Sequence, residues 1–436
     1  MSLSKTPYRG TRDFFPAQKR ERDYLFATMT KIAHRFGYES YDGPLLEEVE
    51  LYKAKSGEEL INEQIYSFVD RGERFVAIRP EMTPTLARMV AQIHRETPKP
   101  IRWFSLPNLM RYEKPQRGRL REHWQLNCDL FGGPAAFSEA EVLSLLVQIL
   151  NELGATQEHF EILINDRRIV DGLFQTKLKL EEAVIYRLYK IIDKSKKVNA
   201  EALTKMISEL QLSTEAQELF QEYLGLKTIE DLQAFLKKTG LEETAQEFQS
   251  FWDYSTAFGV APYLQYDPTI VRGLDYYTGI VFEAFDKNPE NRRALCGGGA
   301  YSSLLKIFNE EPVPGVGFGL GDVTLTDFLK THKLMPDLSK PVNDLFLSCQ
   351  DEAGLTSIIA VSQLLRKRGL NLVVGLEAIK MKKVFSSAEK AGAAFVGLMG
   401  SDEITKKELQ LKNLATGEQK SFALNDCDGM ENFLKG

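Results

Sequence analysis

Hydrophobic positions divide the chain into stretches of different periodicity. Residues 18–36 carry apolar side chains at helical spacing, and Gly37 follows as a helix stop. Short apolar runs separated by turn residues come next. The runs 66–69 and 75–78 flank a short polar segment, which is typical of a β-hairpin. Strands that do not alternate with helices predict an α+β fold with an antiparallel sheet and helices packed against it.

After this region the sequence becomes charged, Leu-rich and helical in spacing, with few strand signals. Strand-like sequence returns at 269–285 and at 315–325, so the helical stretch is predicted to be an insertion in the sheet domain. A Pro-containing linker leads to a last segment in which strands and helices alternate. The predicted boundaries are 1–167 and 256–330 for the two parts of the sheet domain, 168–255 for the helical insertion, 331–341 for the linker and 342–436 for the terminal α/β domain.

Composition and charge narrow the class of protein. The chain has 436 residues, of which 43% are apolar and 27% charged, and this excludes a disordered chain. No apolar run approaches the roughly 20 residues that span a bilayer, and the first residues lack the apolar core of a secretory signal. A net charge of −6 argues against non-specific coating of nucleic acid but permits a local basic patch, such as 366–368 or 380–383.

Cysteine and histidine spacing bears on metal binding and compartment. The four cysteines lie far apart and the five histidines form no HExxH or Cys/His cluster, so we expect no metal site. Scattered cysteines suit reduced thiols, and we therefore expect a cytoplasmic protein.

The most informative polar pattern lies in RWFSLPNLMRYEKPQRGRLREHWQLNCDLFG. Two strands joined by a basic loop would set Arg111 and Glu113 opposite Gln125 and Asp129, because side chains alternate between the faces of a strand. A fixed arginine that faces a polar cluster is suited to holding a phosphate. The alternative is a surface hairpin with a solvated charged loop.

Glycine-rich runs at IVRGLDYYTG, CGGGAY and GVGFGLG permit close approach of a ligand, although each alone is more often a turn or packing contact.

Taken together, these segments closely resemble the histidyl-tRNA synthetases, which are class II aminoacyl-tRNA synthetases, over nearly the whole chain. The matching pieces are RGTRDFFP, PLLE with Pro44 as motif 1, RPEMTPTLAR, RYEKPQRGRLREHWQL as motif 2, RGLDYYTG and GGGAY as histidine-specific motifs, and GVGFGLG as motif 3. The resemblance implies an antiparallel catalytic sheet, a helical insertion that contacts tRNA, a C-terminal anticodon-binding domain and a homodimer built around motif 1. It also implies activation of L-histidine with Mg²⁺-bound ATP, followed by transfer to tRNA(His).

The resemblance assigns roles to individual residues. Arg111 and Arg272 would contact the α-phosphate from two sides as the catalytic pair. The remaining ATP contacts would be Glu113 at the adenine amino group, Arg119 in the motif 2 loop and His123 at the stacking position. The histidine pocket would consist of Glu81, Thr83, Gln125, Asp129, Tyr277 and Tyr301.

The sequence departs from the family pattern at several places. Asp129 stands where the family usually has Glu, and Ala300 and Ser302 replace charged residues of the second histidine motif. His123 stands where Phe often stacks on adenine. Motif 3 normally ends in an arginine for the ATP γ-phosphate, and our alignment puts Thr324 there. An arginine of the motif 2 loop is a candidate replacement.

The sequence leaves two other functions as alternatives. A histidine-binding regulatory paralogue of ATP phosphoribosyltransferase would bind histidine without charging tRNA, but such paralogues usually lack an anticodon-binding domain and tend to lose polar catalytic positions. A non-tRNA amino-acid ligase on the same fold would leave residues 342–436 without a purpose. The retained polar residues and the last domain therefore favour histidine–tRNA ligase.

Overall fold

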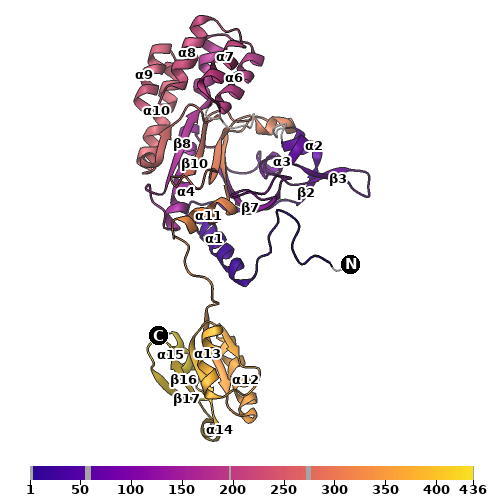
Figure 1. The fold of residues 1–436 in the computed structure, drawn as a ribbon, viewed down its shortest axis with the longest axis vertical. Coiled ribbons are helices and arrows are strands. Elements are labelled where there is room, and N and C mark those ends of the chain that lie inside the picture. Colours follow the sequence, from indigo (N-terminus) through magenta and orange to yellow (C-terminus); the bar gives the residue numbers. More distant parts are fainter. Residues whose placement is uncertain (1–2, 55–59, 196–197, 272–275, 436) are drawn as a thin grey trace. The chain divides into compact units, whose positions relative to one another are not determined.

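The computed structural model describes residues 3–54, 60–195, 198–271 and 276–435. The chain forms two compact units (Figure 1). The first comprises Met1–Asp13 with Arg22–Met335, and the second comprises Phe14–Glu21 with Pro336–Gly436. Among the described residues, no helix has the length and apolar character needed to cross a membrane.

A nine-stranded sheet forms the centre of the first unit. Its strand order is β1 (Glu39–Ser40), β5 (Ile101–Ser105), β7 (Glu122–Phe131), β12 (Gly315–Gly321), β11 (Cys296–Tyr301), β10 (Ile280–Asp286), β8 (Phe160–Asp166) and β9 (Leu264–Tyr266), and β6 (Asn108–Met110) also pairs with β7. The pairs from β5 to β8 are antiparallel, which confirms the predicted α+β class.

Both edges of this sheet are parallel, which the sequence analysis did not anticipate. β1 pairs with β5, and β8 pairs with β9, in parallel. A parallel pair requires a long crossover connection. The helical stretch after β8 provides that connection, because the chain returns to the sheet at β9 only after these helices.

Two predicted strands are shorter than expected. In the segment 269–285 the strand begins only at Ile280, so Tyr276 and Tyr277 precede it. In the segment 315–325 the strand stops at Gly321, and helix α11 (Asp322–Thr331) begins at once. Thr324 therefore lies in the first turn of a helix rather than on a strand.

Helices cover the sheet, and a small second sheet extends the unit. Buried apolar faces of α1 (Pro16–Arg35) and α4 (Ala135–Glu152) contribute to the main core. Gly37 has a φ of 75° after α1, which confirms the predicted stop. The small sheet has the order β2 (Leu46–Glu48), β4 (Phe75–Ile78), β3 (Tyr66–Val69), so the predicted hairpin is confirmed. Nearby are α2 (Val49–Lys53), the π-helical turn Leu60–Gln64 and α3 (Thr83–Ile93).

The helical stretch lies beyond the β8 side of the sheet (Figure 1). It contains α5 (Arg167–Asp171), the π-helical segment Gly172–Lys177, α6 (Glu182–Lys194), α7 (Ala200–Ser208), α8 (Thr214–Leu224), α9 (Ile229–Thr239) and α10 (Glu242–Ala257). Short 3-10 turns follow at Ala261–Tyr263 and Leu304–Phe308. Apolar residues of these helices join the core of the sheet, so a separate module with the boundaries 168–255 stays a prediction.

The second unit is a five-stranded sheet with helices on both faces. The strand order is β14 (Leu372–Val374), β13 (Asn343–Cys349), β15 (Ala393–Met399), β16 (Glu408–Asn413), β17 (Gln419–Ala423), and the helices are α12 (Glu352–Lys367), α13 (Met381–Lys390), α14 (Ser401–Lys406) and α15 (Cys427–Lys435). Leu345 and Leu347 belong to the core that includes α12 and α15, whereas Phe346 belongs to the core that includes α13. This alternation explains why β13 is a continuous apolar run. The hairpin β16–β17 and α14 were not predicted.

Candidate active site

A small polar cavity lies against the centre of the main sheet. Its volume is about 70 Å³, and β7, β11 and β12 form its floor. All six residues predicted for histidine binding line this cavity: Glu81, Thr83, Gln125, Asp129, Tyr277 and Tyr301. Three members of β7, namely Gln125, Asn127 and Asp129, share the cavity, as the alternation of side chains along a strand predicts.

Glycines of β12 make room for the polar side chains of β7. Gly317 lies opposite Asp129 in the antiparallel ladder. A Cβ at Gly317 would lie 2.1 Å from Asp129 Oδ1, and one at Gly319 would lie 2.6 Å from the Gln125 amide. Side chains at these two positions are therefore excluded by space. The alternating glycines of GVGFGLG hold the cavity open for the carboxylate and the amide.

Asp129 is the most strongly perturbed carboxyl group of the cavity. Its side chain is 5% exposed, and Tyr301 Oη donates a hydrogen bond of 2.5 Å to its Oδ1. Burial raises the pKa of Asp129 to about 7, and the hydrogen bond from Tyr301 opposes this rise. Among the described residues no cation pairs with Asp129, so this buried carboxylate can accept an ammonium group, which would lower its pKa again.

A second cavity of about 540 Å³ adjoins the first. The two cavities share Arg111, Gln125, Gly297 and Gly319 in their linings. Of the residues predicted to bind ATP, Arg111, Glu113, Arg119 and His123 line the second cavity. The remaining predicted residue, Arg272, lies outside the described residues.

The position of Arg111 differs in detail from the predicted arrangement. The backbone N–H of Arg111 donates to the carbonyl of Arg121. The backbone N–H of Gln125 donates to the carbonyl of Pro107, not to a residue near Arg111. Arg111 therefore follows β6 and does not lie directly across the ladder from Gln125 or Asp129. The Arg111 guanidinium nevertheless reaches the shared wall of the cavities, where its Nε donates to the Pro80 carbonyl at 2.8 Å. The segment before α3 thus orients this arginine.

Charged neighbours surround the predicted adenine contacts. Glu113 forms an ion pair with Arg119, so the two predicted ATP residues bind each other in this state. Burial, together with the nearby cations Arg111, Arg12 and Arg119, lowers the pKa of His123 to about 3. His123 is therefore a neutral imidazole at physiological pH, and a neutral ring can stack on a base.

Arg121, also in the motif 2 loop, lines neither cavity. Its guanidinium stacks on Tyr112, 4.0 Å from the ring centre, and donates to Tyr8 Oη at 2.8 Å. Its backbone holds Arg111. Arg121 is thus a positioning residue for the loop rather than a phosphate ligand.

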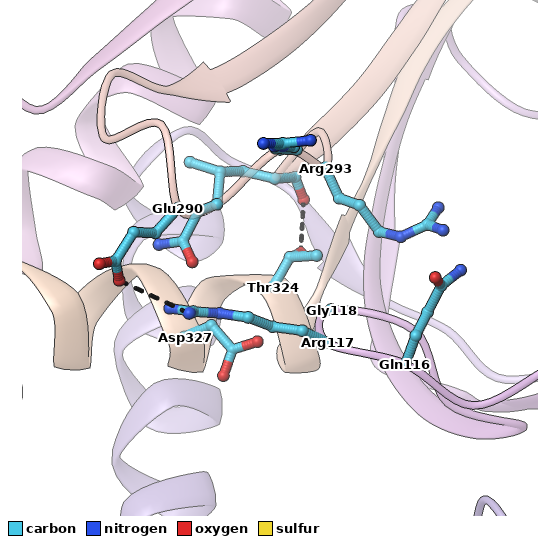
Figure 2. A pocket seen from close by; sticks show the side chains of 10 residues that line it. Gln116, Arg117, Gly118, Glu290, Arg293, Thr324 and Asp327 are labelled. Carbon is cyan, nitrogen blue, oxygen red and sulfur yellow. Dashed lines mark hydrogen bonds and ion pairs between the residues drawn. The ribbon is translucent and has the colours of Figure 1, made fainter.

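A third cavity of about 480 Å³ continues from the second (Figure 2). Its walls are the motif 2 loop, the β10–β11 connection and the first turns of α11. Thr324 donates its hydroxyl to the Leu295 carbonyl at 3.3 Å, and Arg117 lies 3.6 Å from Glu290. Arg292 and Arg293 line both this cavity and the second one. Sequence reasoning missed these two arginines, although the pair lies only two residues before the CGGG run.

Asp322 is a second residue that the sequence analysis did not single out. It begins α11, is buried, and pairs with Arg12 at 2.7 Å while it accepts the Trp124 N–H. Burial raises the pKa of Asp322, and Arg12 opposes that rise. The N-terminal RGTRD segment is thereby tied to β7 and α11 at the edge of the second cavity.

Comparisons with known proteins agree with this geometry. The family model described as "Histidyl-tRNA synthetase" matches residues 10–323, and the "Anticodon binding domain" model matches residues 347–429. The histidine–tRNA ligase of Leptospira biflexa is 41% identical over 427 residues, which is 98% of this chain and 97% of the relative.

Solved structures give the same fold. A histidyl-tRNA synthetase from Nostoc aligns with a TM-score of 0.81 at 23% identity, covering 99% of this chain and all of that chain. An ATP phosphoribosyltransferase regulatory subunit/histidyl-tRNA synthetase from Bacillus halodurans aligns with a TM-score of 0.76 at 21% identity, over 92% of this chain and all of that one. The fold alone does not separate these two activities, whereas the sequence comparisons do. With a family model over residues 10–323 and a relative 41% identical along almost its entire length, the chain belongs to the histidyl-tRNA synthetase family.

Proposed function

We propose that the chain is a histidine–tRNA ligase that activates L-histidine with Mg²⁺-bound ATP and transfers the histidyl group to the 3′ end of tRNA(His). The observation that carries this proposal is the junction of the two cavities at Arg111 and Gln125. A small polar pocket joined to a larger arginine-lined cavity suits an amino acid whose carboxylate must meet a nucleotide phosphate.

Histidine would occupy the smaller cavity. Asp129 and Gln125 receive its ammonium group, and Glu81 and Tyr277 bind the two nitrogens of its imidazole, while Thr83 and Tyr301 complete the walls. A competitor that lacks the imidazole leaves these buried polar groups unpaired. Sites that hydrogen-bond their substrate in this way reach discrimination of roughly 10⁴ without an editing step.

ATP would occupy the larger cavity as its Mg²⁺ complex. Its adenine lies between His123 and the amino-group acceptor Glu113, and Arg119 moves from Glu113 toward the phosphates. The histidine carboxylate oxygen attacks the α-phosphorus, the bond to the β-phosphate oxygen breaks, and pyrophosphate leaves. Arg111 offsets the charge that develops on the α-phosphate in the transition state. Arg272 is assigned to the same phosphate from its motif alone.

The transfer step would use the second unit for recognition. A ribose hydroxyl at the 3′ end of tRNA attacks the histidyl carbonyl, and AMP leaves. Residues 342–436 would bind the anticodon, with the helical insertion 168–255 against another part of the tRNA. Exposed lysines at the start of α13, Lys380, Lys382 and Lys383, give this unit a basic patch for phosphates. Arg368 is less available, because it pairs with Asp428 and Glu431.

We propose a homodimer that forms through the small sheet. Large apolar side chains are exposed there, and an isologous contact would cover them. They are Leu45, Leu46, Phe68, Val69 and Phe75. The proposed compartment is the cytoplasm, which suits the four free cysteines of the chain.

The test is histidine-dependent exchange of pyrophosphate into ATP, measured with and without tRNA. The wild-type protein should exchange pyrophosphate with histidine alone, and Arg111→Ala should lose at least about 100-fold in rate, as loss of one preorganised electrostatic contact does. Arg35→Ala, at the exposed end of α1, is the matched control and should retain activity. Histidine binding without exchange in the wild type would instead support the regulatory paralogue.

A further inference from the structure

The connection between β10 and β11 brings an arginine to the place where the sequence lacks one. Arg293 is half-buried and lines both the second and third cavities. Thr324 lines the same two cavities from the first turn of α11. In Figure 2 the Arg293 side chain extends above Thr324, on the opposite side from Arg117.

Gly118 shows how close these groups are. A Cβ placed on Gly118 would lie 3.3 Å from Arg293 Cδ and 3.3 Å from Thr324 Cγ2. The two side chains therefore flank one point beside the tip of the motif 2 loop. Gly118 has a φ of 70°, which favours glycine, so the loop comes close to both side chains because it carries no side chain there.

The arginines of the β10–β11 connection, Arg292 and Arg293, differ from three other arginines in and beside the cavities because they form no ion pair among the described residues. Arg119 is paired with Glu113, and Arg117 lies beside Glu290. Arg12, at the edge, is held by Asp322. Within the described parts of the chain, Arg293 and its exposed neighbour Arg292 have no ion-pair or hydrogen-bond partner. Acidic side chains such as Glu283 and Asp327 also line these cavities, but among the described residues none of them pairs with Arg293. A half-buried guanidinium that faces a cavity and has no protein anion as its partner is suited to binding an anionic ligand.

We propose that Arg293 binds the β- and γ-phosphates of ATP and thereby replaces the motif 3 arginine for which this chain has Thr324. This inference rests on the proposed function, because it assumes that ATP occupies the second cavity. Arg111 lies at the junction with the histidine cavity, whereas Arg293 lies at the opposite end, which the second and third cavities share. The α-phosphate belongs at the junction, so the outer phosphates lie toward Arg293.

The experiment compares steady-state pyrophosphate exchange for the wild type, Arg293→Ala, Arg293→Lys and Arg292→Ala. The KM for ATP should rise about 10- to 100-fold in Arg293→Ala, the loss expected for one charge-assisted hydrogen bond, and less in Arg293→Lys. The KM for histidine should change less than about twofold, because Arg293 does not line the histidine cavity. Binding of a non-hydrolysable histidyl-adenylate analogue, which has no β- or γ-phosphate, should stay unchanged.

A second variant keeps the inference falsifiable if loss of activity reflects misfolding. In Arg293→Ala the space beside Gly118 is vacated, so Thr324→Arg in the same chain has room for its longer side chain. The double variant should recover most of the ATP affinity. Arg35→Ala, at the exposed end of α1, again serves as the arginine control.

The outcomes separate this inference from the proposed function. A wild-type protein without histidine-dependent exchange would refute the proposed function. An active wild type with an unchanged KM for ATP in Arg293→Ala would overturn the role of Arg293 only. Equal weakening of ATP and of the adenylate analogue would mean that Arg293 contacts the nucleoside, and a loss confined to Arg292→Ala would assign the contact to Arg292; either result also overturns the inference.

Discussion

Replacing Asp129 by asparagine should stabilise the substrate-free protein at alkaline pH while it abolishes efficient histidine activation. Asp129→Asn keeps the size of the side chain and an acceptor for the Tyr301 hydroxyl. It removes the negative charge, which burial makes unfavourable in the folded state. The variant therefore separates the energetic cost of the buried carboxylate from its proposed role in binding the ammonium group.

The magnitude follows from the pKa. Burial raises the pKa of Asp129 from 3.8 to about 7, so between these two pH values the folded protein binds more protons than the unfolded chain. The free energy of unfolding therefore falls as pH rises through this window, by about 1.4 kcal/mol per pH unit, and levels off above pH 7. Asparagine has no proton to lose. Its stability advantage over the wild type should grow by about 2 kcal/mol between pH 5.5 and pH 8.

Thermal unfolding of the two proteins without substrate, followed from pH 5.5 to pH 8, measures this difference. In a unit of this size about 1 kcal/mol shifts Tm by roughly 2 °C or less, so the Tm difference should widen by up to about 4 °C. Asp70→Asn is the control, because hydrogen bonds from Arg74 and Gly72 lower the pKa of Asp70, and its effect should not vary over this range. A Tm difference that does not widen with pH, or a less stable Asp129→Asn at pH 8, would refute the reasoning.

Three further predictions concern the nucleotide site, the glycine strand and the second unit. His123→Phe should change the KM for ATP less than about threefold from pH 6 to pH 9, because the pKa of His123 is about 3 and the wild-type ring is already neutral; an inflection near pH 6.5 that only the wild type shows would contradict this. Gly317→Ala should raise the KM for histidine at least about tenfold and that for ATP far less, since its Cβ would meet Asp129 Oδ1; exchange assays in which both KM values rise equally would disagree. Lys382→Glu combined with Lys383→Glu should lower tRNA charging about tenfold but leave pyrophosphate exchange intact, and equal losses would argue against an anticodon role.

Local patterns in the sequence predicted the parts of the fold that local physics determines. The hairpin Tyr66–Val69 and Phe75–Ile78 was predicted with the bounds that the structure has, because Asp70 closes the turn by accepting the N–H groups of Gly72 and Arg74. The alternating glycines of β12 predicted a surface that another group can approach closely. In the structure those groups are the side chains of Asp129 and Gln125 on β7. The hairpin β16–β17 was not predicted, although ELQLKN alternates polar and apolar side chains as a half-buried strand does.

The arrangement around Thr324 depends on contacts that no local pattern contains. Thr324, Gly118 and Arg293 come from three segments, and their proximity depends on the pairing of β7, β12 and β11. The pairing of β12 with β7 also places Gly317 opposite Asp129, so that the polar face of β7 lines the histidine cavity. Motif 3 taken alone shows only that Thr324 stands where the family has an arginine. The folded sheet brings the β10–β11 connection, which carries Arg293, to the same cavities as Thr324. The positive charge that motif 3 lacks can therefore come from Arg293.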